Sequence, residues 1–277
     1  MIDFFVLLTP IIMIVVVSLV VFVGCDVAFG LKRVPIPFGL AAKTRSQRVD
    51  LTWIGINQAK KYKLWRHQGV AVPELLETVL HPQTFFVDTK DLVDGMEYLY
   101  QISMIDGDGD ESGKSDPVNA TPNPVNFIQM LTLTTARNNF TGFVGMGLQV
   151  GADDLDIVEI GRPFGVGNMQ THKIKIIDAA AANAELGSVM VDTTKPPRSV
   201  GQFQYLPLAQ KVTLAAGGTY YILSEETSGG DDFYRHDATV GLATNVATVL
   251  GAYFEQPPGT FTQDMQAPMI YPVDFKY

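Results

Sequence analysis

The hydrophobic pattern divides the chain into an apolar N-terminal stretch and a long remainder in which apolar and polar positions alternate. Residues 4–25 form an uncharged run of 22 positions between Asp3 and Asp26. At ~1.5 Å of rise per residue, a helix over this run reaches ~33 Å, which is enough to cross the hydrocarbon core of a bilayer. We therefore predict one long hydrophobic α-helix over residues 1–30.

Three interpretations of this run are open. A secretory signal peptide is disfavoured, because no Lys or Arg precedes the run and because the run exceeds the usual ~7 to 15 apolar residues. A lipoprotein signal would end at Cys25, which follows Val23 and Gly24, and would leave Cys25 lipidated. We favour a retained helix, in which neighbouring groups accommodate a kink at Pro10.

The basic residues after the run complicate its orientation in a membrane. Lys32, Arg33 and Lys43 follow the helix, and the positive-inside rule would keep that side in the cytoplasm. The segments that follow are typical of extracellular modules. A helix that packs against copies of itself in a filament would remove this conflict.

The run weakly resembles the hydrophobic N-terminal helix of type IV pilin-like subunits. The resemblance implies that an acidic residue near the N-terminus offsets the α-amine of a neighbouring subunit. The helix then has either a membrane or identical subunits as its partner. The residues predicted to take part in anchoring or assembly are Asp3, Phe4, Phe5, Pro10 and Cys25.

Short alternating segments between residues 34 and 122 predict a small antiparallel sandwich. Apolar and polar residues alternate over 49–53, which is the period of a strand with one buried face. The alternation recurs over 62–66 and 98–104, and Asp-Gly at 94–95 supplies turn chemistry. Several short strands separated by turns are typical of a two-sheet sandwich.

This segment resembles the fibronectin type III family. Residues 37–42 look like the opening strand of the family, 49–53 like the strand with its core tryptophan, and 62–66 like the following strand. Residues 92–100 look like the corner at which a tyrosine hydroxyl bonds to the backbone. The resemblance covers 34–122 in the expected order, and it implies a spacer or binding module without catalytic chemistry.

An acidic turn in this segment has some features of a calcium site. Asp106, Asp108 and Asp110 have the spacing of the first three ligands of an EF-hand loop. However, Glu111 stands where that loop needs Gly, and Pro117 stands where it needs a bidentate Glu. We interpret the segment as a solvated hairpin turn and predict no metal site.

The rest of the chain, residues 126–277, also alternates, but over longer segments with more glycine. Some nine or ten strands in this length are typical of a jelly roll or a similar two-sheet sandwich. Residues 178–186, DAAAANAEL, have helical composition, but we predict a turn or loop there. Strands are predicted over 140–150, 155–160, 172–177, 187–191, 202–206, 211–214, 219–223, 247–254 and 269–275.

The second module resembles the jelly-roll domains attached to bacterial surface and secreted proteins. The residues behind the resemblance are 143–147, 157–164, 172–178 and 214–222, in which strands follow Gly-bounded turns. Some domains of this kind bind carbohydrate, so the resemblance implies glycans as candidate ligands.

One predicted loop of the second module, residues 229–236, contains the residue types of a binding site. A sugar can be held by aromatic stacking together with bidentate hydrogen bonds from charged side chains. The alternative is a polar sandwich loop in which Gly229 and Gly230 make a turn. The candidate ligand-binding residues are Asp231, Asp232, Tyr234, Arg235 and His236.

Composition narrows the function classes. The formal net charge of -9 disfavours nucleic acid as a partner, because the phosphates would be repelled. The single cysteine excludes an intrachain disulfide. No Walker loop, HExxH helix or nucleophile elbow surrounds the Ser, His and Asp residues, so we predict no catalytic residue, no cofactor and no enzyme activity.

The sequence therefore predicts an all-β protein of two tandem sandwiches, residues 34–122 and 126–277, preceded by the helix of residues 1–30. The favoured function is a structural or adhesive protein of the cell surface or extracellular space, anchored or assembled into a homo-oligomeric, pilus-like filament through the helix. The alternative is a membrane-tethered carbohydrate-binding module that serves polysaccharide degradation.

Overall fold

The fold is known from a computed structural model that describes residues 33–133, 135–181, 183–235, 240–265 and 271–277. Within these ranges the chain is all β, as the sequence predicts, and they include no α-helix. None of the described segments is a helix that could cross a bilayer. The helix predicted over residues 1–30, with Asp3, Phe4, Phe5, Pro10 and Cys25, lies outside the described residues.

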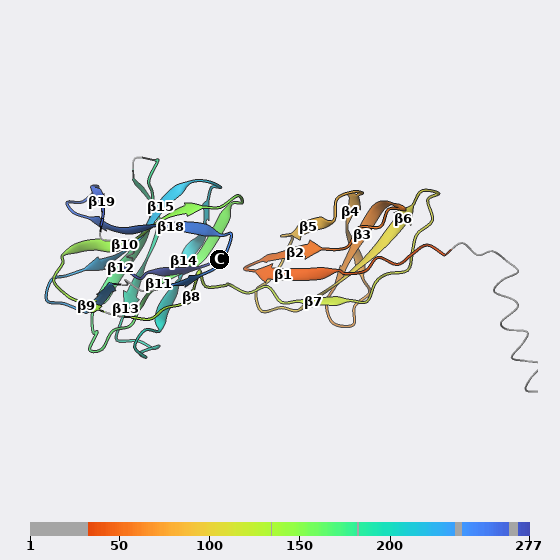
Figure 1. Cartoon of the computed structure of the whole chain (residues 1–277). Helices are drawn as coiled ribbons and strands as arrows, with labels where there is room; N and C mark the ends of the chain where they lie inside the picture. The colour runs from red at the N-terminus through yellow and green to blue at the C-terminus, as the bar shows by residue number, and fades with distance from the viewer. Residues whose placement is uncertain (1–32, 134, 182, 236–239, 266–270) are drawn as a thin grey trace, which may run out of the picture. The chain divides into compact units, whose positions relative to one another are not determined.

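The chain divides into two compact units (Figure 1). Of the described residues, the first unit takes those up to 43, then 50–87 and 97–120, and the second takes 44–49, 88–96 and 121–277. Strand pairing gives sheets drawn from residues 41–120, here called the first sandwich, and sheets drawn from residues 128–276, here called the second sandwich. The boundaries 34–122 and 126–277 themselves stay a prediction.

The first sandwich contains a three-stranded and a four-stranded sheet. The smaller sheet has the order β1 (Ala41–Arg45), β2 (Arg48–Thr52), β5 (Phe85–Asp88). The larger sheet is antiparallel, with the order β4 (Glu74–Leu80), β3 (Ala59–His67), β6 (Tyr98–Asp106), β7 (Val118–Ala120). The strands predicted around 49–53, 62–66 and 98–104 correspond to β2, β3 and β6.

The predicted alternation in these strands buries one face of each. Leu51 and Leu64 are fully buried, and Trp53 is 5% exposed. The Trp53 ring meets the edge of Tyr62 at a centroid distance of 5.4 Å, and the Tyr62 hydroxyl accepts a hydrogen bond of 2.7 Å from the N–H of Ile56. Trp53 is therefore a core residue, as the resemblance implies.

The acidic segment after β6 is a turn. Oδ1 of Asp106 accepts the N–H groups of Asp108 and Asp110, each at 3.0 Å, so the first carboxylate closes the turn on itself. Among the residues that the structure describes, no three His, Cys, Asp or Glu side chains gather where they could hold a metal ion.

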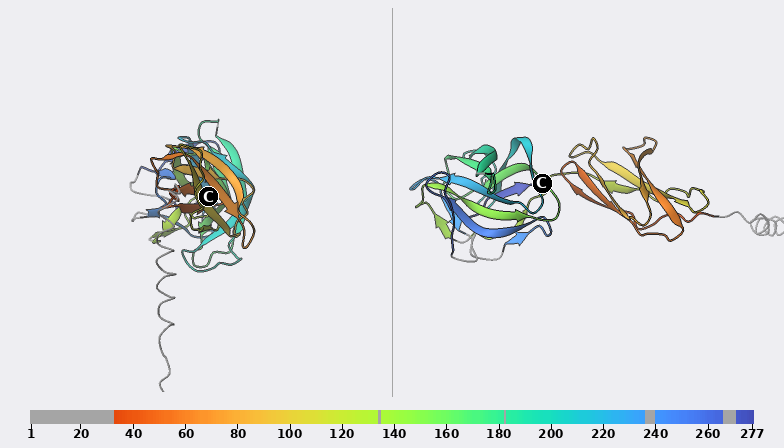
Figure 2. Two further views of the ribbon diagram at one scale, coloured as in Figure 1. Left: turned by 90° about the vertical axis from the view of Figure 1, so that its right-hand side faces the viewer. Right: turned by 90° about the horizontal axis from the view of Figure 1, so that it is seen from above.

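The second sandwich is built on a six-stranded and a three-stranded sheet. In Figure 2, light-blue β15, green β10 and blue β18 of the larger sheet run side by side. The larger sheet has the order β13 (Ala184–Asp192), β12 (Thr171–Asp178), β15 (Thr219–Glu226), β10 (Gly142–Val150), β18 (Ala247–Glu255), β19 (Phe261–Gln263). The smaller sheet has the order β14 (Phe203–Leu214), β11 (Leu155–Pro163), β20 (Asp274–Lys276).

Two further pairs of short strands complete this sandwich. β16 (Phe233–Arg235) pairs with β9 (Thr135–Arg137), and β17 (Gly241–Leu242) pairs with β8 (Ile128–Met130). One apolar core joins the two large sheets, since it includes Met146 of β10, Ile157 of β11 and Phe275 of β20. Phe127 stacks on Phe275 at a centroid distance of 4.7 Å, which ties the segment before β8 to this core.

Some predicted segments differ from the structure in detail. The strands predicted over 202–206 and 211–214 are parts of one continuous strand, β14, which begins at Phe203, and a register shift against β11 between Ile157 and Glu159 absorbs the break in alternation. Residues 178–186 contain no helix: Oδ1 of Asp178 accepts the N–H groups of Ala180 and Ala181 and closes a turn, and β13 starts at Ala184.

Candidate functional site

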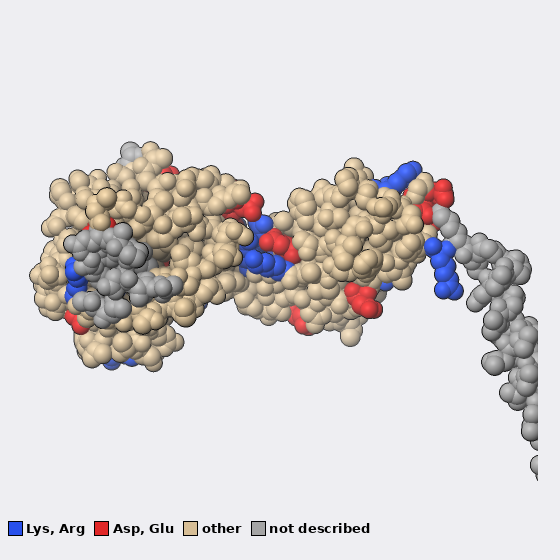
Figure 3. Space-filling view, in the orientation of Figure 1, with Lys and Arg blue, Asp and Glu red and all other residues tan. Residues whose placement is uncertain are grey.

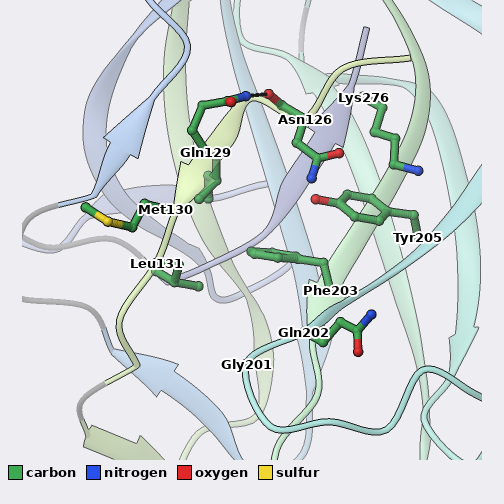
Figure 4. A pocket seen from close by; sticks show the side chains of 10 residues that line it. Asn126, Gln129, Met130, Leu131, Gly201, Gln202, Phe203, Tyr205 and Lys276 are labelled. Atoms are coloured by element: carbon green, nitrogen blue, oxygen red, sulfur yellow. Dashed lines mark hydrogen bonds between the residues drawn. The ribbon is translucent and has the colours of Figure 1, made fainter. Parts of the chain in front are cut away.

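A groove of about 450 Å³ opens in the second sandwich (Figure 4). Three segments far apart in the sequence line it: residues 126–131 without the buried Phe127, residues 201–205 without the buried Gln204, and Lys276. Its volume lies within the range of ~300 to 1,000 Å³ that is typical of small-molecule sites.

Phe203 and Tyr205 form an aromatic pair in this groove. They lie two positions apart on β14, so both side chains project from the same face of the strand. Their ring centroids are 5.6 Å apart and their planes differ by 24°. Gln204 between them is 4% exposed and donates to the backbone oxygen of Lys195 at 2.6 Å. The two half-buried rings give the groove a flat apolar floor (Figure 4).

A glycine on the neighbouring strand makes room for the Tyr205 ring. Gly161 of β11 pairs with Tyr205 on one side and with Asp274 on the other. A Cβ atom at Gly161 would lie 2.9 Å from Cδ1 of Tyr205 and 2.3 Å from the backbone oxygen of Gln204. Because no side chain stands there, Tyr205 reaches across β11 to β20.

Asp274 of β20 accepts hydrogen bonds from two segments that line the groove. It is fully buried, its Oδ2 accepts the Tyr205 hydroxyl at 2.6 Å, and its Oδ1 accepts the N–H of Ile128 at 2.9 Å. Burial raises the pKa of Asp274 to about 7, although the hydrogen bonds from Tyr205 and Ile128 act in the opposite direction. Burial and the nearby carboxyl group likewise raise the pKa of Tyr205. One buried carboxyl group thus holds both the floor and the 126–131 wall.

The charge of Lys276 at the edge of the groove is offset. Its Nζ lies 2.8 Å from Oε2 of Glu159, and both side chains are about one-quarter exposed. The same ammonium lies 4.5 Å from the centroid of the Tyr205 ring. The lysine therefore supports the tyrosine ring and is already partnered by a carboxylate.

Side-chain amides supply the uncharged polar groups of the groove. Asn126, Gln129 and Gln202 line it, and Nε2 of Gln129 donates to the backbone oxygen of Asn126. Aromatic rings offer a surface for the C–H face of a sugar, and amides offer both donors and acceptors to its hydroxyl groups. The arrangement can therefore hold a neutral, polyhydroxylated ligand.

The residues predicted from the 229–236 loop lie elsewhere in the second sandwich. Asp231 is 6% exposed, and its carboxylate accepts the N–H groups of Met169 and Gln170 at 2.7 and 2.8 Å. Nε2 of His172 lies 3.1 Å from the same carboxylate, and Thr193 Oγ1 lies 2.8 Å from it. Burial acts to raise the pKa of Asp231, but these hydrogen bonds outweigh it and lower the pKa.

Asp232 and Tyr234 of that loop also face the protein itself. The backbone oxygen of Asp232 accepts Nη2 of Arg162 and Nδ2 of Asn168, each at 3.0 Å, and Tyr234 is 8% exposed. Arg235 is placed by its backbone in β16, and His236 lies outside the described residues. Asp231, Asp232 and Tyr234 are thus brought together around a buried polar network, and ligand binding by this loop stays a prediction.

The groove was missed by sequence reasoning. Its one local signal is the Phe203-x-Tyr205 alternation within the predicted strand 202–206. The residues that complete it, Ile128 and Asp274, are 146 positions apart, so no spacing rule connects them.

Comparison with known proteins gives partial matches, and no family model matches the chain. An amylopullulanase of Thermoanaerobacter thermohydrosulfuricus is 31% identical over 85 residues, which are 30% of this chain and 6% of that protein. The chain thus spans only a small part of that relative.

Solved structures give further matches. An Fn3-like protein from Clostridium thermocellum is 25% identical, covers 31% of this chain and 92% of its own, and has a TM-score of 0.28. A segment of two fibronectin type III domains from chicken tenascin is 12% identical, covers 77% of this chain and 98% of its own, and also has a TM-score of 0.28. Both are fibronectin type III or Fn3-like proteins, the family that residues 34–122 resemble.

Proposed function

We propose that this chain is a non-enzymatic glycan-binding protein of the cell surface or extracellular space, and that the groove of the second sandwich is its binding site. The observation that carries the proposal is the Phe203–Tyr205 pair, which lies half-exposed in a groove edged by side-chain amides. Stacking on a rigid aromatic floor gains contact area with little loss of side-chain freedom.

The charges around the groove favour a neutral glycan. Lys276 is partnered by Glu159, and the amides of Asn126, Gln129 and Gln202 are uncharged. On the face drawn in Figure 3, most of the surface is neither acidic nor basic, and the charged side chains lie in a few small groups. An acidic polysaccharide would find no unpaired cation among the residues that line the groove.

The fibronectin type III-like segment and residues 1–30 would support binding by the second sandwich. The fibronectin type III-like segment would act as a spacer, and the similarity of part of the chain to a protein named amylopullulanase makes pullulan a suitable first glycan to test. Residues 1–30 keep their predicted role as membrane anchor or filament core. Their deletion should abolish membrane association or sedimentable polymers, respectively.

The proposal is tested by affinity electrophoresis of the full chain in gels that contain pullulan, amylopectin, xylan or the acidic polysaccharide pectin. Retardation is expected with at least one neutral polysaccharide and should be lost in Phe203→Ala. Leu206→Ala is the matched control, because Leu206 lies on the same strand, is 38% exposed and does not line the groove. Equal retardation of both variants, or retardation by pectin alone, would contradict the proposal.

A further inference from the structure

We propose that Asp274 is a positioning residue that couples the floor of the groove to its wall, so that glycan binding depends on the protonation of this one carboxyl group. The inference rests on the proposed function and adds a mode of regulation to the same site.

The two oxygens of Asp274 hold two separate parts of the groove. Oδ2 is bonded to the hydroxyl of Tyr205, which belongs to the aromatic floor. Oδ1 is bonded to the N–H of Ile128, which belongs to the 126–131 wall. Because Asp274 is fully buried, water does not compete for these bonds. A change at this carboxyl group therefore reaches both sides of the groove.

The Tyr205 hydroxyl and the Ile128 N–H are both hydrogen-bond donors to Asp274, and this makes its protonation state matter. The carboxylate accepts both bonds, which are then charge-assisted and stronger than bonds between neutral groups. The neutral acid carries one proton of its own. An N–H group cannot accept that proton, whereas the Tyr205 oxygen can. The acid would then donate to Tyr205, and the phenol proton would turn away from Asp274. Protonation thus weakens the attachment of the floor and the wall.

Burial of the Asp274 carboxyl group places this change near neutral pH, against the opposing effect of its hydrogen bonds and of Lys276. Tyr205 of β14 faces the carboxyl group. Lys276 and Tyr277 approach it from β20 and the residue that follows, and Glu159 of β11 is paired with Lys276. Burial raises the pKa of both tyrosines, so neither phenol ionises near neutrality. With a pKa of about 7, Asp274 changes charge in this range.

The test measures the affinity of the full chain for soluble pullulan, or for the neutral polysaccharide that retards it, between pH 5.5 and 8.5. Because the ionised form is the better-organised one, affinity should rise by ~3- to 10-fold with pH, the effect of about one hydrogen bond. The rise should disappear in Asp274→Asn. Tyr205→Phe keeps the ring and removes the coupled hydroxyl, so it should also flatten the profile if Asp274→Asn does not fold.

Tyr221→Phe is the matched control, because it removes a half-buried tyrosine hydroxyl from the other sheet and should keep the rise. In NMR spectra, the Ile128 amide and the Tyr205 ring should titrate with one midpoint near pH 7. Different midpoints, or an affinity that is constant with pH while glycan is bound, would overturn the inference. Absence of binding at every pH would instead overturn the proposed function.

Discussion

Arg162 and Glu226 lie side by side inside the second sandwich, with 3.3 Å between Nη2 and Oε1 and side chains at most 2% exposed. Burial lowers the pKa of Arg162 and raises the pKa of Glu226, and the attraction between the two charges opposes both shifts. Nη2 of Arg162 also donates to the backbone oxygen of Asp232. The pair therefore anchors the segment that leads into β16.

Removal of one member of this pair should strongly destabilise the second sandwich. Arg162→Leu leaves the Glu226 carboxylate buried without its partner, which typically costs ~3 to 5 kcal/mol of the free energy of unfolding. Urea denaturation of the wild type and the variant measures this loss. The double variant Arg162→Leu, Glu226→Leu should recover part of it, because no uncompensated charge remains.

An exposed ion pair provides the control for this prediction. Lys195 lies 3.8 Å from Asp192 and its side chain is 72% exposed. Lys195→Ala should change the free energy of unfolding by no more than ~0.5 kcal/mol. A loss from Arg162→Leu as small as that from Lys195→Ala would show that the buried pair is not important for stability.

Asp231 should stabilise the fold at neutral pH and lose this effect in acid. Its pKa is lowered in the folded chain, so the folded state favours the carboxylate. This contribution is present above the unfolded pKa of ~3.9 and is lost as pH falls through the lower folded value. Asp231→Asn should therefore melt below the wild type at pH 7, with a difference that shrinks below about pH 4.

The exposed Asp153 serves as the control for Asp231. Asp153→Asn should follow the wild-type melting curve at each pH. A difference between Asp231→Asn and wild type that grows in acid would contradict the assigned role.

The contribution of Asp274 to stability should change with pH in the direction opposite to that of Asp231. Its pKa is raised to about 7, so the folded state favours the protonated acid. Its contribution is complete below the unfolded pKa of ~3.9 and is lost as pH rises through 7, by at most ~4 kcal/mol. Asp274→Asn should lack this decline. Thermal melts from pH 4 to 8.5 measure this decline in stability. A decline of equal size in the variant would assign the decline to other groups.

Gly161 should be intolerant of a side chain. The Cβ of Gly161→Ala would meet the backbone oxygen of Gln204 at 2.3 Å and the Tyr205 ring at 2.9 Å, so the strand pair and the ring must both move. Overpacking of this kind costs ~1 to 3 kcal/mol, and glycan affinity should fall as well. Gly107→Ala, where a Cβ meets nothing within 4 Å, should affect neither quantity.

The sequence predicted the elements that its local periodicity encodes. Alternation located β2, β3, β6 and the long strands of the second sandwich, and the resemblance to fibronectin type III implied that Trp53 is a core residue. Alternation could not locate strands of two or three residues such as β17, because a segment of that length is too short to show an alternating pattern. It also could not show that β14 is continuous, since the bulge depends on pairing with β11.

The candidate site was harder to predict than the fold. The polar residues around Asp231 have the composition of a binding loop, and their burial against Met169, His172 and Thr193 appears only in the folded chain. The groove depends on Tyr205 and Asp274, which are 69 positions apart and meet across a glycine. Composition identifies residues capable of binding, whereas tertiary structure decides which of them face solvent.

The most direct test of the groove is an NMR titration of the full chain, labelled with ¹⁵N, with oligosaccharides derived from the polysaccharide that retards it most. The account predicts that shift changes concentrate at residues 126–131, at Phe203 to Tyr205 and at Lys276, and that Phe203→Ala abolishes them. Shift changes confined to residues 229–236, with none at Phe203 or Tyr205, would contradict it.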